Sequence, residues 1–164
     1  MEKPAPTEHP IHELLRRRWS PRAFSGKPLD AAVLTRLFEA ARWAPSSYNE
    51  QPWTFVYATK DQPEEYQRLL GCLIPFNQSW AQQAPLLVVT VARLNFAKNN
   101  TPNRHAYHDV GLAVGDLVAQ ATAEGLFCHQ MAGIEYEKAR TDLQIPAGFD
   151  PVTAIAIGYP GDPA

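Results

Sequence analysis

Apolar residues recur along much of the chain about every three or four positions, which is the spacing of one face of an α-helix. The clearest example is Ala31–Ala44, where Val33, Leu37 and Ala41 share a single face. The same periodicity, together with capping residues and helix-breaking prolines, predicts helices over Ile11–Arg18, Ala31–Ala44, 63–70, Asn77–Gln83, Tyr107–Glu124 and Glu135–Leu143.

Other segments are rich in aromatic and β-branched residues or almost continuously apolar, and both patterns favour β-strands. Strands are predicted over Trp53–Ala58, Leu86–Ala92, Leu126–Ala132 and Val152–Gly158. Helices and strands mix throughout the chain without a repeat or a linker. This order predicts one layered α+β or α/β domain over residues 11–164, with a sheet covered by helices. Residues 1–10 are polar and proline-rich, and we expect a flexible N-terminal lead-in there.

Composition and charge exclude several classes of protein. Of the 164 residues, 45% are hydrophobic and 20% are charged, as in an ordinary globular protein and unlike a disordered one. The formal net charge of −2 provides no general attraction to nucleic acid or to an anionic membrane. No apolar run approaches the roughly 18 residues of a membrane span, and the first residues have no signal-peptide core. Cys72 and Cys128 form no disulfide or metal-binding pattern, so we expect a cytoplasmic protein.

A basic, hydroxyl-bearing cluster follows the first predicted helix. Arg18, Ser20 and Arg22 stand close together in the sequence. Guanidinium groups bind phosphate through two parallel hydrogen bonds, and a serine hydroxyl adds another. The cluster therefore suits one phosphate group, although the same residues would also form an ordinary basic helix end in solvent.

The segment Pro45–Pro52 is a polar loop bounded by prolines. Its side chains supply hydroxyl and amide groups that both donate and accept hydrogen bonds: Ser46, Ser47, Asn49 and Gln51. Prolines at both ends limit the freedom that the loop would lose on binding. Such a loop could bind the edge of a heterocycle, and the alternative is an ordinary polar turn.

Other familiar sites are not indicated. The sequence contains neither GxGxxG nor GxxxxGK[ST], and it lacks HExxH and GxSxG. His105, His108 and Asp109 could suit a metal by spacing, but no further ligand is indicated, so we expect no metal site. Cys128 and His129 are neighbours on a predicted strand and would point to opposite faces, which argues against a nucleophilic pair.

At the two polar clusters the sequence resembles the FMN-dependent nitroreductase family. The stretch from Arg18 to Phe24 matches the family's Arg-x-Ser-x-Arg-x-Phe signature, and Ala44 to Trp53 matches Ala-Pro-Ser-Ser-x-Asn-x-Gln-Pro-Trp. The similarity covers residues 11–160, with further matches at Asp109, Gly111, Ala113, Gly125, Leu126, 145–148 and 157–160.

The resemblance implies an α+β fold with a central mixed β-sheet flanked by helices, in an intertwined homodimer with FMN at the subunit interface. One subunit would hold the phosphate and ribityl region with Arg18, Ser20, Arg22 and the backbone of Trp19. The other would reach the flavin with Pro45, Ser46, Ser47, Asn49 and Gln51. The pyrimidine edge and N5 would lie near Asn77 and near Met131, Ala132 and Gly133, with a backbone N–H of Ala132 or Gly133 donating to N5.

The implied activity is hydride transfer from NADH or NADPH, through N5 of FMN, to an electron-poor small molecule such as a nitroaromatic or a quinone. The kinetics would be ping-pong, and no side chain need act as an essential acid or base. Because a fold does not fix a reaction, dehalogenation, flavin fragmentation, non-redox flavin binding and a purely structural role stay open. Family members usually continue beyond Gly-Tyr-Pro with a basic phosphate contact and an arm around the partner, whereas this sequence ends at Ala164.

Overall fold

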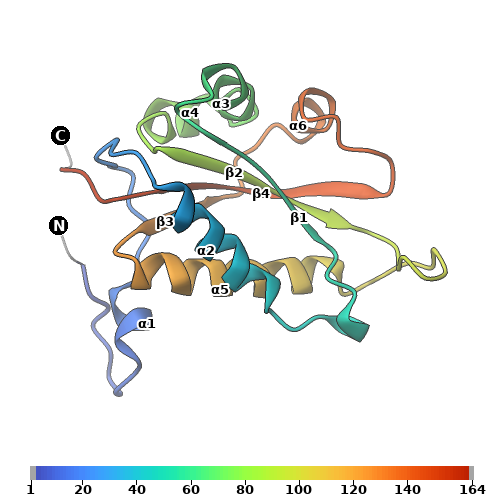
Figure 1. Ribbon diagram of the computed structural model, residues 1–164, viewed down its shortest axis with the longest axis horizontal. Coiled ribbons are helices and arrows are strands. Elements are labelled where there is room, and N and C mark those ends of the chain that lie inside the picture. Colours follow the sequence, from blue (N-terminus) through green and yellow to red (C-terminus); the bar gives the residue numbers. More distant parts are fainter. Residues whose placement is uncertain (1–2, 163–164) are drawn as a thin grey trace.

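The helices and strands follow the hydrophobic pattern. The computed structural model describes residues 3–162, and every predicted helix and strand is present in that range (Figure 1). In chain order the elements are α1 (Glu13–Arg17), α2 (Ala31–Arg42), the 3₁₀ turn η1 (Ser47–Asn49), β1 (Trp53–Thr59), α3 (Pro63–Leu70), α4 (Pro75–Ala81), β2 (Leu86–Arg93), α5 (Ala106–Ala123), β3 (Phe127–Met131), α6 (Tyr136–Asp142) and β4 (Phe149–Gly158).

The last strand begins earlier than predicted. β4 starts at Phe149 rather than Val152, and so it contains Pro151. Proline interrupts a strand pattern because it has no N–H to donate to the ladder. Here the register between β2 and β4 shifts between Thr90 and Val91, so Pro151 lies beside an irregularity of the ladder where proline is tolerated.

The α+β class is confirmed, with a correction to the arrangement of the sheet. Within residues 3–162 the strands form a four-stranded sheet in the order β1-β2-β4-β3. All three neighbouring pairs are antiparallel, so the sheet is not the expected mixed one. The physical reason is the position of β4: it lies between β2 and β3, which run in the same direction and would otherwise pair in parallel.

Helices cover both faces of the sheet. Figure 1 shows α2 and α5 below the sheet, and α3, α4 and α6 above it. Alternate residues of β2 enter the two resulting cores: Leu86 and Val88 pack with α2 and α5, whereas Leu87 and Val89 pack in the other core. The nearly unbroken apolar run of β2 therefore reflects a strand that is buried on both faces, as predicted.

The long helix α5 runs along one face of the sheet (Figure 1). It contains 18 residues, which corresponds to about 27 Å at about 1.5 Å per residue. The turn η1 lies beside the start of α5, and α1 packs near its end (Figure 1). Within the described residues no helix is both long and apolar enough to cross a membrane.

Candidate functional site

The segment that carries the basic cluster leaves α1 and runs along β3. Arg18 is the residue at the C-terminal cap of α1. The ring of Trp19 packs at 5.9 Å from that of Phe127, at the start of β3. The carbonyl oxygen of Pro21 lies 2.9 Å from Nδ1 of His129, farther along the same strand. β3 therefore holds this segment by an apolar contact and by a hydrogen bond.

The polar members of the cluster remain exposed. Arg18, Ser20 and Arg22 are all on the surface, whereas Pro21 between them is buried. The guanidinium of Arg22 lies 5.1 Å from the ring centre of Phe76, a cation–π contact with the first turn of α4. The structure thus presents two cations and one hydroxyl on a fixed stretch of backbone, a donor set that fits a phosphate.

The beginning of α4 contacts the segment after β3 through a side chain that the sequence analysis selected. Nδ2 of Asn77 donates to the carbonyl oxygen of Gly133 at 3.1 Å, and the backbone N–H of Ile74 donates to the same oxygen at 3.1 Å. A Cβ on Gly133 would lie 2.6 Å from Nδ2 of Asn77 and 2.7 Å from Cδ1 of Ile74, so a larger residue would force these side chains to move. Met131 is buried at the end of β3, and Ala132 is exposed.

Three segments therefore meet in one region, which we call the β3 region: residues 18–22, the first part of α4 and residues 131–133. The contacts that join them are Arg22 with Phe76, Asn77 with Gly133, and the rings of His129 and Trp80, whose centres are 4.5 Å apart. Direct contacts are made by Trp19, Arg22, Asn77 and Gly133, and the segments that these contacts join also carry Arg18, Ser20, Met131 and Ala132.

The loop from Pro45 to Gln51 has an unusual backbone. Tyr48, Asn49 and Gln51 have φ angles of 53°, 54° and 48°, in the left-handed region that residues other than glycine rarely occupy. The hydroxyl of Ser46 accepts a hydrogen bond from the N–H of Gln51 at 3.0 Å and closes the loop. Backbone strain of this kind persists where surrounding contacts impose it, and it is often found at functional sites.

Two carboxylates anchor this loop from outside. Oδ2 of Asp109, in the first turn of α5, accepts from the N–H of Ser47 at 3.0 Å, and the Asp109 side chain is only 3% exposed. The Glu50 carboxylate pairs with Arg93 and accepts from the N–H of Ala97 at 2.6 Å. Asp109 was considered above as a metal ligand and as a match to the family pattern, but neither it nor Glu50 was expected to hold the loop. An acid in the first turn of a helix is the signal that could have pointed to Asp109.

The two groups of predicted residues do not meet within one chain. Ser47 is bonded to the first turn of α5, whereas Trp19 packs on Phe127, which follows the end of that helix. In Figure 1, η1 lies beside the start of α5 and α1 lies near its end. The helix α5, about 27 Å long, thus lies between the anchor of the polar loop and the Trp19–Phe127 contact. The predicted site residues of the loop are Pro45, Ser46, Ser47, Asn49 and Gln51.

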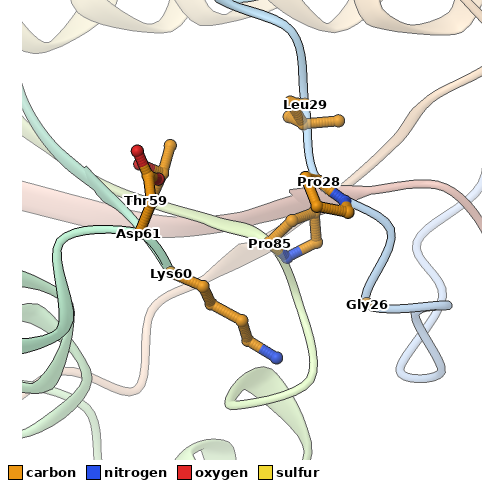
Figure 2. A pocket seen from close by; sticks show the side chains of 7 residues that line it. All are labelled: Gly26, Pro28, Leu29, Thr59, Lys60, Asp61 and Pro85. Carbon is orange, nitrogen blue, oxygen red and sulfur yellow. The ribbon is translucent and has the colours of Figure 1, made fainter.

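A separate hollow of about 280 Å³ contains none of the predicted site residues. Figure 2 shows its lining of Gly26, Pro28, Leu29, Thr59, Lys60, Asp61 and Pro85. Its polar side chains are already engaged: Nζ of Lys60 donates to the carbonyl oxygen of Gln83 at 3.2 Å, and the hydroxyl of Thr59 pairs with Asp61. This hollow therefore lacks the donor set that the β3 region offers.

Cys128 belongs to the core. Burial raises the pKa of its thiol to about 12, even though the charge of Arg18 acts in the opposite direction. A thiol with so high a pKa stays protonated at neutral pH and is a poor nucleophile. This agrees with the sequence argument against a nucleophilic pair of Cys128 and His129.

Comparison with known proteins gives a consistent result. A solved structure described as an oxidoreductase containing FMN superposes with a TM-score of 0.90 and 37% identity over 95% of this chain and 80% of its own. An iodotyrosine deiodinase of Haliscomenobacter hydrossis is 26% identical over 178 residues, which cover 93% of this chain and 80% of that protein. An NADH dehydrogenase of Thermus thermophilus is 24% identical over 177 residues, covering 89% and 84%.

The fold is thus that of a family of α+β oxidoreductases. The model of the nitroreductase family matches residues 15–85 and 73–159. These two matches cover most of the sequence, and the chain belongs to the nitroreductase family.

Proposed function

We propose that this protein is an FMN-dependent oxidoreductase that uses NADH or NADPH. When bound, FMN supplies the transfer of hydride from the nicotinamide to an electron-poor acceptor such as a nitroaromatic or a quinone. The observation that carries the proposal is the β3 region, where the Arg-Ser-Arg cluster and the Asn77–Gly133 contact lie together. The solved relative that contains FMN, at 37% identity, supports the choice of cofactor.

The residues of the β3 region have separate tasks in this proposal. Arg18, Ser20 and Arg22 bind the phosphate, and the backbone of Trp19 supports the ribityl chain. Asn77 lies on the pyrimidine side of the ring. Met131, Ala132 and Gly133 form the wall near N5, where a backbone N–H of Ala132 or Gly133 stabilises the reduced flavin. None of these groups needs to exchange a proton with the acceptor, since the flavin carries the chemistry.

A second copy of the chain completes the proposed site. The polar loop is anchored at the start of α5 and Trp19 packs beyond the end of that helix, which is about 27 Å long. The loop residues concerned are Pro45, Ser46, Ser47, Asn49 and Gln51. We infer that these residues reach the flavin from a partner subunit. We therefore propose a homodimer in which each FMN lies between the β3 region of one copy and the polar loop of the other.

The visible absorption spectrum of the purified protein tests this proposal. We expect flavin bands that bleach on anaerobic addition of NADH or NADPH and return with a quinone. Flavin bands that neither nucleotide bleaches would indicate a non-redox flavin-binding protein. A protein that stays colourless after incubation with FMN would refute the proposal.

Two matched variants localise the phosphate site. Arg22→Gln removes one charge-assisted hydrogen bond, worth about 1.5–3 kcal/mol, and should weaken FMN binding roughly 10- to 150-fold. Arg104→Gln removes an exposed cation outside the β3 region and should leave the Kd for FMN unchanged. Equal effects of the two substitutions would mean that only the overall charge matters.

Reductive dehalogenation is a second candidate activity. It is favoured by the similarity to the Haliscomenobacter hydrossis iodotyrosine deiodinase, which extends over 93% of this chain. Iodide release from an iodinated phenol by the reduced protein would support it. Turnover of quinones with no iodide release would leave the oxidoreductase proposal alone.

A further inference from the structure

His129 lies in the middle of β3 and contacts the segment of the basic cluster. Its Nδ1 is 2.9 Å from the carbonyl oxygen of Pro21, a residue 108 positions earlier in the sequence. A backbone carbonyl only accepts hydrogen bonds, so Nδ1 must carry the hydrogen and donate it. This requirement fixes which ring nitrogen is protonated as long as the contact exists.

The other contact of the imidazole is with α4. The ring of Trp80 packs on it with centres 4.5 Å apart and an angle of 42° between the planes. Trp80 is on the same short helix as Asn77, whose amide donates to the carbonyl oxygen of Gly133. His129 therefore touches both the segment of the basic cluster and the helix that carries Asn77.

Pro21 stands between Ser20 and Arg22, so the position of its carbonyl group determines where both side chains start. We propose that His129 is a positioning residue for flavin binding, which holds Ser20 and Arg22 at a fixed distance from Asn77 and Gly133. This inference rests on the proposed function, in which residues 18–22 bind the phosphate of FMN while Asn77 and Gly133 lie beside its ring.

His129 would strengthen flavin binding because it spares the protein the cost of ordering the backbone of residues 20–22 when FMN binds. Residues that are fixed before a ligand arrives lose no further conformational freedom on binding, whereas mobile ones lose it at the expense of affinity. Arg22 has a second restraint, its contact with Phe76 at 5.1 Å, but this holds the end of the side chain and not the backbone. Without His129, the affinity for the phosphate should fall while the affinity for the ring is retained.

Side-chain geometry provides a matched pair of variants. In asparagine, Nδ2 occupies the place of Nδ1 in histidine, so His129→Asn keeps a donor toward Pro21. In glutamine the nitrogen lies one bond farther out, at the place of Nε2, so His129→Gln offers its donor in the wrong position. Both substitutes are polar and smaller than the imidazole, and they lose the packing on Trp80 to a similar extent.

The test compares FMN with riboflavin, which has the same ring and ribityl chain but no phosphate. The full-length protein is freed of flavin, and both affinities are measured by the change of flavin fluorescence on titration. We expect His129→Gln to bind FMN about 10-fold more weakly than wild type and riboflavin within about 2-fold of wild type. His129→Asn should recover most of the FMN affinity. Arg22→Gln serves as the reference for losing phosphate recognition alone.

Three results would overturn the inference. The first is an equal loss of FMN and riboflavin affinity, which indicates general damage to the fold. The second is an unchanged FMN affinity in His129→Gln, and the third is an Asn variant no better than the Gln variant. A wild-type protein that binds neither flavin would instead refute the proposed function, and the positioning role with it. Thermal unfolding of each flavin-free variant shows whether a loss of affinity accompanies a loss of stability.

Discussion

Removal of the Asp109 carboxylate should destabilise the polar loop and the protein as a whole. Its Oδ2 accepts from the N–H of Ser47 at 3.0 Å, and hydrogen bonds to charged groups contribute about 1.5–3 kcal/mol. A negative charge in the first turn of α5 adds about 0.3–1 kcal/mol through the helix dipole. Asp109→Ala should therefore lower the free energy of unfolding by about 2–4 kcal/mol. Asp109→Asn keeps an oxygen that accepts from Ser47 and should cost about half as much.

Equilibrium unfolding in urea, followed by circular dichroism, measures these differences as shifts of the midpoint at constant slope. Asp116→Ala is the control, because Asp116 is exposed on the same helix and its loss should change stability by less than about 0.5 kcal/mol. If Asp109→Ala unfolds at the wild-type midpoint, the anchoring role is refuted. If the Asn and Ala variants lose equal stability, the charge at the helix start matters and the bond to Ser47 does not.

Three further predictions concern other parts of the chain. Gly133→Ala places a Cβ 2.6 Å from Nδ2 of Asn77 and should lower the free energy of unfolding by about 1–3 kcal/mol; an unchanged urea midpoint would contradict this. Tyr48→Gly and Tyr48→Ala both lose the ring contact with Phe96, but only glycine relieves the φ of 53°, so Tyr48→Gly should be more stable than Tyr48→Ala by up to about 1 kcal/mol in the same assay. Equal stability of the two variants would show that the conformation is not strained. In a Cys72→Ser background, Cys128 should not react with an aromatic disulfide reagent at pH 8, because burial raises its pKa to about 12, and it should react once urea unfolds the protein. Rapid reaction of the folded protein would contradict the buried position.

The elements of the fold could be predicted because their signals are local. Val33, Leu37 and Ala41 are buried in α2, as their spacing indicates, and the apolar run of β2 is buried on both faces. The order of the strands could not be predicted in the same way. β4 pairs with both β2 and β3 through contacts between residues far apart in the sequence, and no periodicity reports on such contacts.

The site, like the fold, has local features that the sequence indicated and long-range contacts that it did not. The residue types of the two clusters indicated phosphate and heterocycle binding, and the family resemblance supported that interpretation. The residues that hold these clusters were not selected, because their partners are distant: Asp109 is 62 positions from Ser47, and His129 is 108 positions from Pro21. The left-handed backbone of Tyr48 could not be predicted either, because tyrosine has no preference for positive φ angles and the contacts that hold the loop impose this one.

The glycines of α5 bear on the two-copy site that we propose above. Gly111 and Gly115 are exposed, and a Cβ added to either would meet no atom of this chain within 4 Å. Glycine inside a helix costs about 1 kcal/mol relative to alanine, and neither residue has the positive φ that would require it. Packing within the described chain therefore does not explain these glycines. Close approach of a second backbone along α5 would explain them, and α5 is the helix whose length separates the polar loop from the β3 region. A partner placed against this helix could bring its own polar loop toward the β3 region, which is the arrangement that the proposed flavin site requires.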